Sequence, residues 1–179
     1  YLPLRPPARG RARGVVALAP AGGWADESWR DTLRLQAGLY EQTKAAVPRA
    51  DAILATTEGR RRATQYLTVR YEHIPVELLT HQLLGVAACS ALPLIDGARR
   101  NGWPLDAERI TCPVRIVWGT EDRLLPWPSA AERHRAALPN ADWVVLDGVG
   151  HCPQLDVPLE AAQLILGLTT GTSGSGASA

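Results

Sequence analysis

Two residues in separate segments of the chain have the types needed to move a proton. His151 lies in GVGHCPQ, directly after the apolar run WVVLD. A neutral imidazole titrates near neutral pH, so it can take up a proton and return it. Asp122 lies in GTEDRLLP, and a carboxylate on the far ring nitrogen would fix the tautomer and stabilise the imidazolium. The pair predicts a general base, His151, oriented by Asp122.

Other assignments of these residues stay open. Glu121 is a second candidate for the acid, Asp122 could instead serve a turn or cap a helix, and His151 could bond only to backbone. A metal site built from His151, Cys152 and Asp156 is a further reading. Adjacent side chains diverge, however, and no second ligand pair has zinc-type spacing. We therefore expect no metal and no cofactor. The remaining histidines lie on expected helices or at their ends: His73, His81 and His134.

Three apolar runs predict the strands that position this pair: VVALAP (15–20), RIVWG (115–119) and WVVLDG (143–148). Each is short, rich in β-branched residues and followed by glycine or proline, which is typical of a buried parallel strand. Helical patterns separate them, so we expect an α/β fold with a parallel sheet of about three strands. Because functional loops follow the carboxyl ends of such strands, Asp122 and His151 should meet at one edge of the sheet.

Apolar residues at spacings of three and four predict helices between and after the strands. Three lie in the long segment between the first two strands, at 27–47, 49–71 and 75–89. Two more follow the second and third strands: 129–138, with Ser129 as a plausible cap, and 158–168, with Pro158 in its first turn. The Gly/Ser-rich tail, 171–179, predicts disorder.

Composition excludes several classes of protein. The 179 residues suffice for one domain, and 46% hydrophobic with 21% charged residues is ordinary for a globular protein. The net charge of +1 favours neither a nucleic-acid nor a membrane partner. Three cysteines argue against a disulfide framework, and Cys89 and Cys112 are expected in the core. No apolar run is long enough to span a membrane, and the odd number of cysteines favours a reducing compartment, so we expect a cytoplasmic protein.

The segments ITCPVRIVWGTEDRLLP and LPNADWVVLDGVGHCPQLDVPLEAAQLI resemble the carboxyl-terminal part of an α/β-hydrolase. In that family a Gly-x-x-Asp-x-x-x-Pro loop supplies the acid of the catalytic triad, matched here by Gly119, Asp122 and Pro126. A Gly-x-Gly-His loop supplies the base, matched by 148–151. VVALAPAGGW resembles the strand that leads into the helical cap. The resemblance implies that 8–23 and 104–170 form the carboxyl-terminal core, and 24–103 the cap over the active site.

The family's nucleophile lies on a Gly-x-Ser-x-Gly turn between a strand and a helix, and this chain contains no such pentapeptide. Ser90 is on an expected cap helix without flanking glycines, and Ser28 and Ser129 are helix-start residues. The chain also begins with Tyr1 and contains no Met. We therefore expect a piece of a longer protein, whose nucleophile and oxyanion hole lie outside it and which is inactive alone.

The resemblance implies a hydrolase acting on a small, apolar ester or a related substrate. Trp24, Trp29 and Tyr40 are candidates to line the substrate site, although helix packing would also account for them. Ester, amide, epoxide, halide and carbon–carbon cleavage all occur on this fold, so the bond and the nucleophile (serine, cysteine or aspartate) stay open. The alternative is a truncated, non-catalytic relative that acts as a binding module. The sequence does not indicate an oligomeric state.

Overall fold

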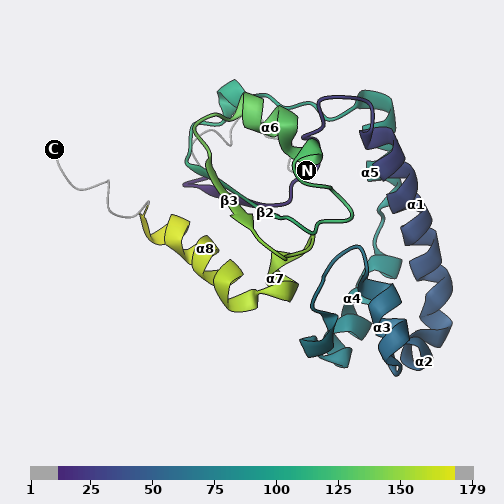
Figure 1. Cartoon of the computed structure of the whole chain (residues 1–179). Helices are drawn as coiled ribbons and strands as arrows, with labels where there is room; N and C mark the ends of the chain where they lie inside the picture. The colour runs from purple at the N-terminus through teal and green to yellow at the C-terminus, as the bar shows by residue number, and fades with distance from the viewer. Residues whose placement is uncertain (1–11, 172–179) are drawn as a thin grey trace.

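The computed structural model describes residues 12–171, and most of the expected tail, 172–179, lies outside the described residues. Its centre is a three-stranded parallel sheet in the order β1-β2-β3 (Figure 1). The strands are β1 (Val15–Leu18), β2 (Val114–Gly119) and β3 (Asp142–Leu146). The expected α/β class with a small parallel sheet is confirmed.

The strand register places the ends of β2 and β3 side by side. Gly119 is paired with Leu146, the last residue of β3. Two backbone hydrogen bonds extend this pairing beyond the strands: Thr120 N donates to Leu146 O at 3.0 Å, and Glu121 N donates to Val149 O at 2.9 Å. The loops after the two strands are therefore held together by backbone hydrogen bonds alone.

The alternation of side chains along β2 gives the sheet two different apolar faces. Ile116 and Trp118 pack with Ala130 and Ala131 on one face, whereas Val117 packs with residues that include Leu164 on the other. Helices cover both faces, as expected for a parallel sheet. They are η4 (Ser129–Ala131) and α6 (Glu132–Ala137) on the first, and α8 (Pro158–Gly171), preceded by the short α7 (Pro153–Asp156), on the second.

The segment between β1 and β2 folds as a group of helices beside the sheet (Figure 1). Its main helices pack on one another, α1 with α4 and α5, and α2 with α3 and α4. The elements are α1 (Trp29–Ala46), η1 (Val47–Arg49), α2 (Ala50–Leu54), α3 (Thr57–Thr64), η2 (Tyr71–His73), α4 (Val76–Ala88), α5 (Leu92–Asn101) and η3 (Ala107–Arg109). That these helices cover an active site stays a prediction. Residues 24–103 are called the cap from here on.

Several local expectations were wrong. The single helix expected at 49–71 is broken, because the Thr56 hydroxyl accepts a hydrogen bond from Gly59 N at 3.0 Å and starts a new helix there. The same segment leaves the helical conformation after Thr64, and α5 and α7 were not expected. Ser129 does not cap a helix, since its hydroxyl donates to Pro126 O at 3.2 Å. Cys89 is exposed rather than in the core.

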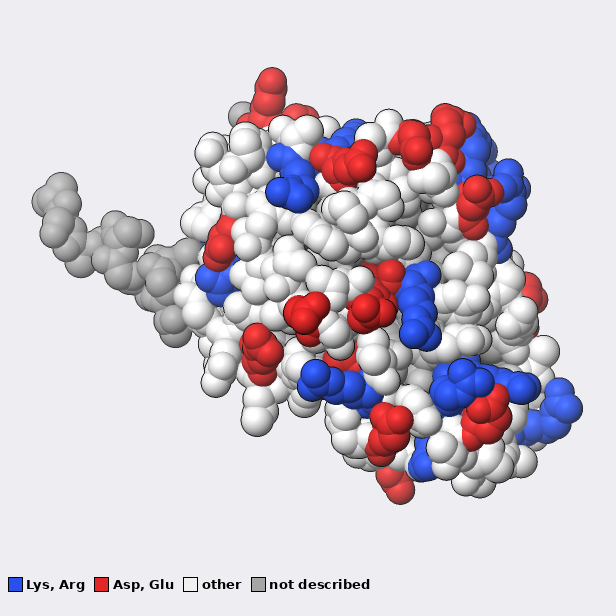
Figure 2. Space-filling view, viewed as in Figure 1, with Lys and Arg blue, Asp and Glu red and all other residues white. Residues whose placement is uncertain are grey.

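Surface charge and hydropathy agree with the composition. Figure 2 shows acidic and basic side chains intermingled on the face that it presents, without a large patch of one sign. Within the described residues no single helix is both long and apolar enough to cross a bilayer, and only the bent pair α4–α5 meets the length and composition criteria jointly.

One buried histidine is expected to make the stability of the fold depend on pH. His134 is 6% exposed, and its Nε2 lies 3.2 Å from Ala21 O. Burial lowers the pKa of His134 below its usual 6.5. Below about pH 6.5 the unfolded chain therefore binds a proton that the folded chain does not, so stability present above this pH is lost as the pH falls.

Urea unfolding at about pH 7.5 and about pH 5.5 tests this effect. We expect the native protein to lose more stability between the two pH values than the His134→Gln variant, whose side chain does not titrate. An equal loss in the two proteins would show that His134 does not carry the effect.

Candidate active site

The loops that follow β2 and β3 bring His151 and Asp122 into direct contact. His151 Nδ1 lies 2.9 Å from Asp122 Oδ2, at the carboxyl ends of neighbouring strands. The Asp122 side chain is fully buried, and the His151 side chain is 18% exposed. No hydrogen bond to His151 Nε2 occurs within the described part of the chain, so this nitrogen is available to a group brought from elsewhere.

The second oxygen of Asp122 is held by its own loop. Asp122 Oδ1 accepts hydrogen bonds from Leu124 N at 2.9 Å and Leu125 N at 2.7 Å. Because both amides bind Oδ1, Oδ2 is left for the imidazole. A carboxylate acting on Nδ1 receives the proton of that nitrogen in a hydrogen bond, which leaves the lone pair of the neutral ring on Nε2. The arrangement therefore suits a base that acts through Nε2.

The neighbouring acid, Glu121, lies differently. Its side chain is exposed. The backbone amide of Glu121, not the carboxylate, donates to Val149 O in the loop after β3, residues 147–152, which we call the base loop. Of the two carboxylates considered from the sequence, Asp122 is the one that contacts His151. The other histidines lie elsewhere: His73 Nε2 bonds to Leu155 O at 2.8 Å, His134 is bound to Ala21 O, and His81 is exposed on α4.

Glycine allows the two loops to approach closely. A Cβ atom on Gly119 would lie 2.1 Å from Val149 O and 2.5 Å from Gly150 O, both backbone atoms of the base loop. Gly148 has φ +65°, in the left-handed region that favours glycine. The glycines that bound the two motifs therefore have a physical reason: one lets the loops meet, and the other turns the chain towards His151.

Cys152 directly follows His151 but is poorly suited to be a nucleophile. Burial, assisted by the carboxylates of Asp122 and Asp156, raises the pKa of the Cys152 thiol to about 11. Since the thiolate is the reactive form, only about one thiol in a thousand is reactive at pH 8.

Alkylation kinetics test this. With iodoacetamide at about pH 8, Cys152 should be modified far more slowly than the exposed Cys89, as followed by peptide mass spectrometry. Modification of Cys152 at the rate of Cys89 would show that the buried thiol is ionised after all.

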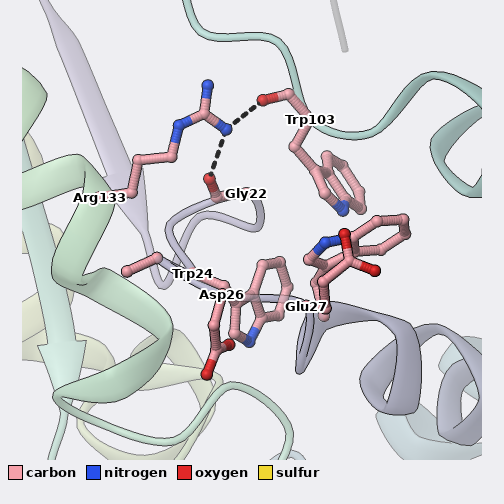
Figure 3. Close-up of a pocket in the computed structure, with 8 residues that line it drawn as sticks. Gly22, Trp24, Asp26, Glu27, Trp103 and Arg133 are labelled. Atoms are coloured by element: carbon pink, nitrogen blue, oxygen red, sulfur yellow. Dashed lines mark hydrogen bonds between the residues drawn. The ribbon is translucent and has the colours of Figure 1, made fainter.

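An aromatic pocket of about 320 Å³ lies where the chain leaves β1 for the helices. Trp24 and Trp29 line it together with Trp103, and the ring centroids of Trp24 and Trp103 are 6.2 Å apart. Figure 3 shows the Arg133 guanidinium holding the wall of the pocket through the carbonyl oxygens of Gly22 and Trp103. Asp26 and Glu27 add acidic groups to its lining.

The third aromatic candidate lies outside that lining. Tyr40 is 8% exposed, and its hydroxyl donates to Cys89 O at 2.7 Å, which ties α1 to the end of α4. The structure thus brings Trp24 and Trp29 together and places Tyr40 among packed helices.

Nucleophile and metal candidates do not gather around the pair. No serine hydroxyl in the described part of the chain is hydrogen-bonded to His151, and Ser28, Ser90 and Ser129 are all exposed. Within the same residues, no group of three or more His, Cys, Asp or Glu side chains could hold a metal ion.

A parallel sheet with an aspartate and a histidine on the loops after neighbouring strands is the arrangement that the resemblance to α/β-hydrolases implies. The chain belongs to the alpha/beta hydrolase family, whose model matches residues 2–164. Among curated proteins it is similar to the epoxide hydrolase EphH of Mycobacterium tuberculosis. The two are 31% identical over 163 residues, covering 88% of this chain and 75% of that protein.

Two solved structures share the fold. The carboxylesterase CesB of Bacillus subtilis matches 92% of this chain with a TM-score of 0.54 and 18% identity. An esterase of Thermogutta terrifontis matches the same share with the same score and identity. The chain spans 54% and 58% of those two proteins, so it corresponds to little more than half of each.

Three residues that lie at or near these sites were not given a role there from the sequence. Trp103 and Arg133 complete the pocket, and Asp156 is buried between the base loop and the cap. Of the three, only Asp156 was a candidate from the sequence, as a possible metal ligand beside His151 and Cys152. Its actual neighbours are backbone amides and a threonine hydroxyl, which a sequence pattern does not reveal.

Proposed function

We propose that this chain is the carboxyl-terminal part of a hydrolase that cleaves a small, apolar ester or a related substrate. His151 is the general base, Asp122 orients it, and the nucleophile comes from a segment outside this chain. The observation that carries the proposal is the 2.9 Å contact between His151 Nδ1 and the buried Asp122 carboxylate, with Nε2 left for a reacting group.

For an ester and a hydroxyl nucleophile, the chemistry follows from this geometry. The nucleophile oxygen attacks the carbonyl carbon, and its proton passes to His151 Nε2. The imidazolium, stabilised by Asp122, then gives that proton to the leaving alkoxide oxygen. A water molecule attacks the acyl group in the second half, and His151 again takes and returns the proton. The oxyanion donors, like the nucleophile, are proposed to come from outside this chain.

The indole rings of the aromatic pocket are the feature that supports an apolar substrate, and the lining also contains Asp26, Glu27 and Arg133. The pocket volume of about 320 Å³ suits a small molecule, and indole rings offer large apolar surfaces. We propose that Trp24 and Trp29 contact the substrate. Tyr40, placed among packed helices, has less support in that role.

A fusion protein tests the proposal. The chain is joined to an amino-terminal segment from a characterised esterase of the same family, including its nucleophile turn, and assayed on 4-nitrophenyl butyrate. We expect turnover in the fusion, a loss of about a thousandfold or more in its His151→Ala variant, and only background hydrolysis by the chain alone. A folded fusion whose turnover is the same after His151→Ala would contradict the proposal and favour a binding module.

A further inference from the structure

A second buried carboxylate lies five residues beyond the proposed base. Asp156, at the end of α7, is 3% exposed, and no ion pair to it occurs among the described residues. A buried charge without a cation is costly unless hydrogen-bond donors surround it. Asp156 has four such donors, and they come from two separate parts of the chain.

One oxygen of Asp156 binds the cap. Oδ1 accepts the hydroxyl of Thr68 and the amides of Val69, at 2.9 Å, and Arg70, at 2.7 Å. These groups lie more than eighty residues earlier in the chain, in the segment that leaves the helical conformation after Thr64. Asp156 is therefore not a cap of its own helix but a tertiary contact, and we call residues 67–70 the cap loop.

The other oxygen binds the loop of the base. Oδ2 accepts the amide of Gly150, directly before His151, at 2.7 Å, and it also shares the amide of Val69 with Oδ1, at 3.2 Å. The amide directly after His151, that of Cys152, donates to Leu67 O of the cap loop at 2.7 Å. Both amides that flank the imidazole are thus fixed by Asp156 or by the segment that Asp156 holds.

Packing at Gly150 leaves little freedom in this arrangement. A Cβ atom there would lie 3.0 Å from Asp156 Oδ2 and 3.1 Å from Thr68 Cα. The base loop, Asp156 and the cap loop are therefore in close contact around one glycine.

We infer that Asp156 is a positioning residue: it holds the loop of His151 against the cap loop and so sets the direction of the imidazole. The inference rests on the proposed function, in which His151 is the base. It adds that the helical segment fixes the base through residues 67–70.

Asparagine at this position separates the two halves of the contact. In Asp156→Asn the amide oxygen can keep the three cap-loop donors, which leaves the amide NH2 facing Gly150 N–H, donor against donor. Thr68→Val is the matched variant, because it removes one hydroxyl from the cap side and leaves Asp156 and Gly150 unchanged. Leu33→Val, in α1, controls for a general loss of stability, since Leu33 is buried at 2% exposure and makes none of these hydrogen bonds.

Nuclear magnetic resonance of the chain itself measures amide exchange and the imidazole proton of these variants, and it requires no turnover. Amide exchange at Gly150 should become about tenfold faster or more in Asp156→Asn. We expect the proton between His151 Nδ1 and Asp122 to give a sharp downfield signal in the native chain and to lose it in Asp156→Asn. Thr68→Val and Leu33→Val should keep that signal. If Asp156→Asn keeps the signal and the slow exchange, or if Leu33→Val loses them equally, Asp156 has only a structural role and the inference is wrong.

This outcome is separable from that of the proposed function. A fusion without His151-dependent turnover would remove the proposed activity and leave the exchange data untouched. An unchanged His151 signal in Asp156→Asn would remove the positioning role and leave the activity untouched.

Discussion

Replacing Gly119 by alanine is expected to lower the free energy of unfolding by about 1–3 kcal/mol, the usual cost of forcing an extra carbon into a packed site. The new Cβ would lie 2.1 Å from Val149 O and 2.5 Å from Gly150 O. Both are backbone atoms, so neither can rotate away. The base loop must therefore move away from the loop after β2 that carries Asp122. Urea unfolding measures the stability.

Gly85→Ala is the matched control for this change. Gly85 lies inside α4, and nothing lies within 4 Å of the position that its Cβ would take. Alanine there should raise stability by about 0.5–1 kcal/mol, because glycine is the poorer helix former. If the Gly119→Ala variant were as stable as the native protein, the close approach of the two loops would be refuted.

The Asp122→Asn substitution, made in the fusion described above, is expected to lower kcat about ten-thousandfold, as loss of the orienting carboxylate does in triad hydrolases. The reason lies in the hydrogen bonds of this carboxylate. Leu124 N and Leu125 N both require an acceptor at Oδ1, so the asparagine oxygen must take that place. Its NH2 group then faces His151 Nδ1 and forces the ring proton onto Nε2, where the base must act.

Asp147→Asn provides the comparison. Asp147 is also on the loop after β3, but it is exposed and accepts the Thr120 hydroxyl at 3.2 Å, which an asparagine oxygen can do as well. Its kcat should stay within about threefold of the parent fusion, since surface substitutions usually have small effects. Equal losses for Asp147→Asn and Asp122→Asn would mean that loop charge, not the orientation of the imidazole, controls the rate.

The sheet and the contact between Asp122 and His151 could be predicted from the sequence because their signals are local. Short β-branched runs that end at glycine indicate buried parallel strands, and such strands bring the loops after their carboxyl ends to one edge. Asp122 and His151 each follow a strand by a few residues. Placing the strands therefore brought the two loops together, and the structure then distinguished Asp122 from Glu121 as the contact of His151.

The cap loop and the aromatic pocket depend on contacts between distant residues, and the sequence did not reveal them. Residues 49–71 have a helical pattern throughout, but residues 68–70 bind Asp156 instead of continuing a helix. The hydrogen bonds gained there outweigh the weak helix propensity of the segment. Trp103 joins Trp24 across almost eighty residues, a pairing that no local spacing encodes.

The tautomer of His151 shows whether Asp122 orients the imidazole, and nitrogen-15 chemical shifts of the ring measure it. In the neutral ring we expect a protonated Nδ1 and an unprotonated Nε2 in the native chain, and the reverse in Asp122→Asn. A native ring that carries its proton on Nε2, or the same tautomer in both proteins, would contradict the assignment of His151 as a base oriented by Asp122.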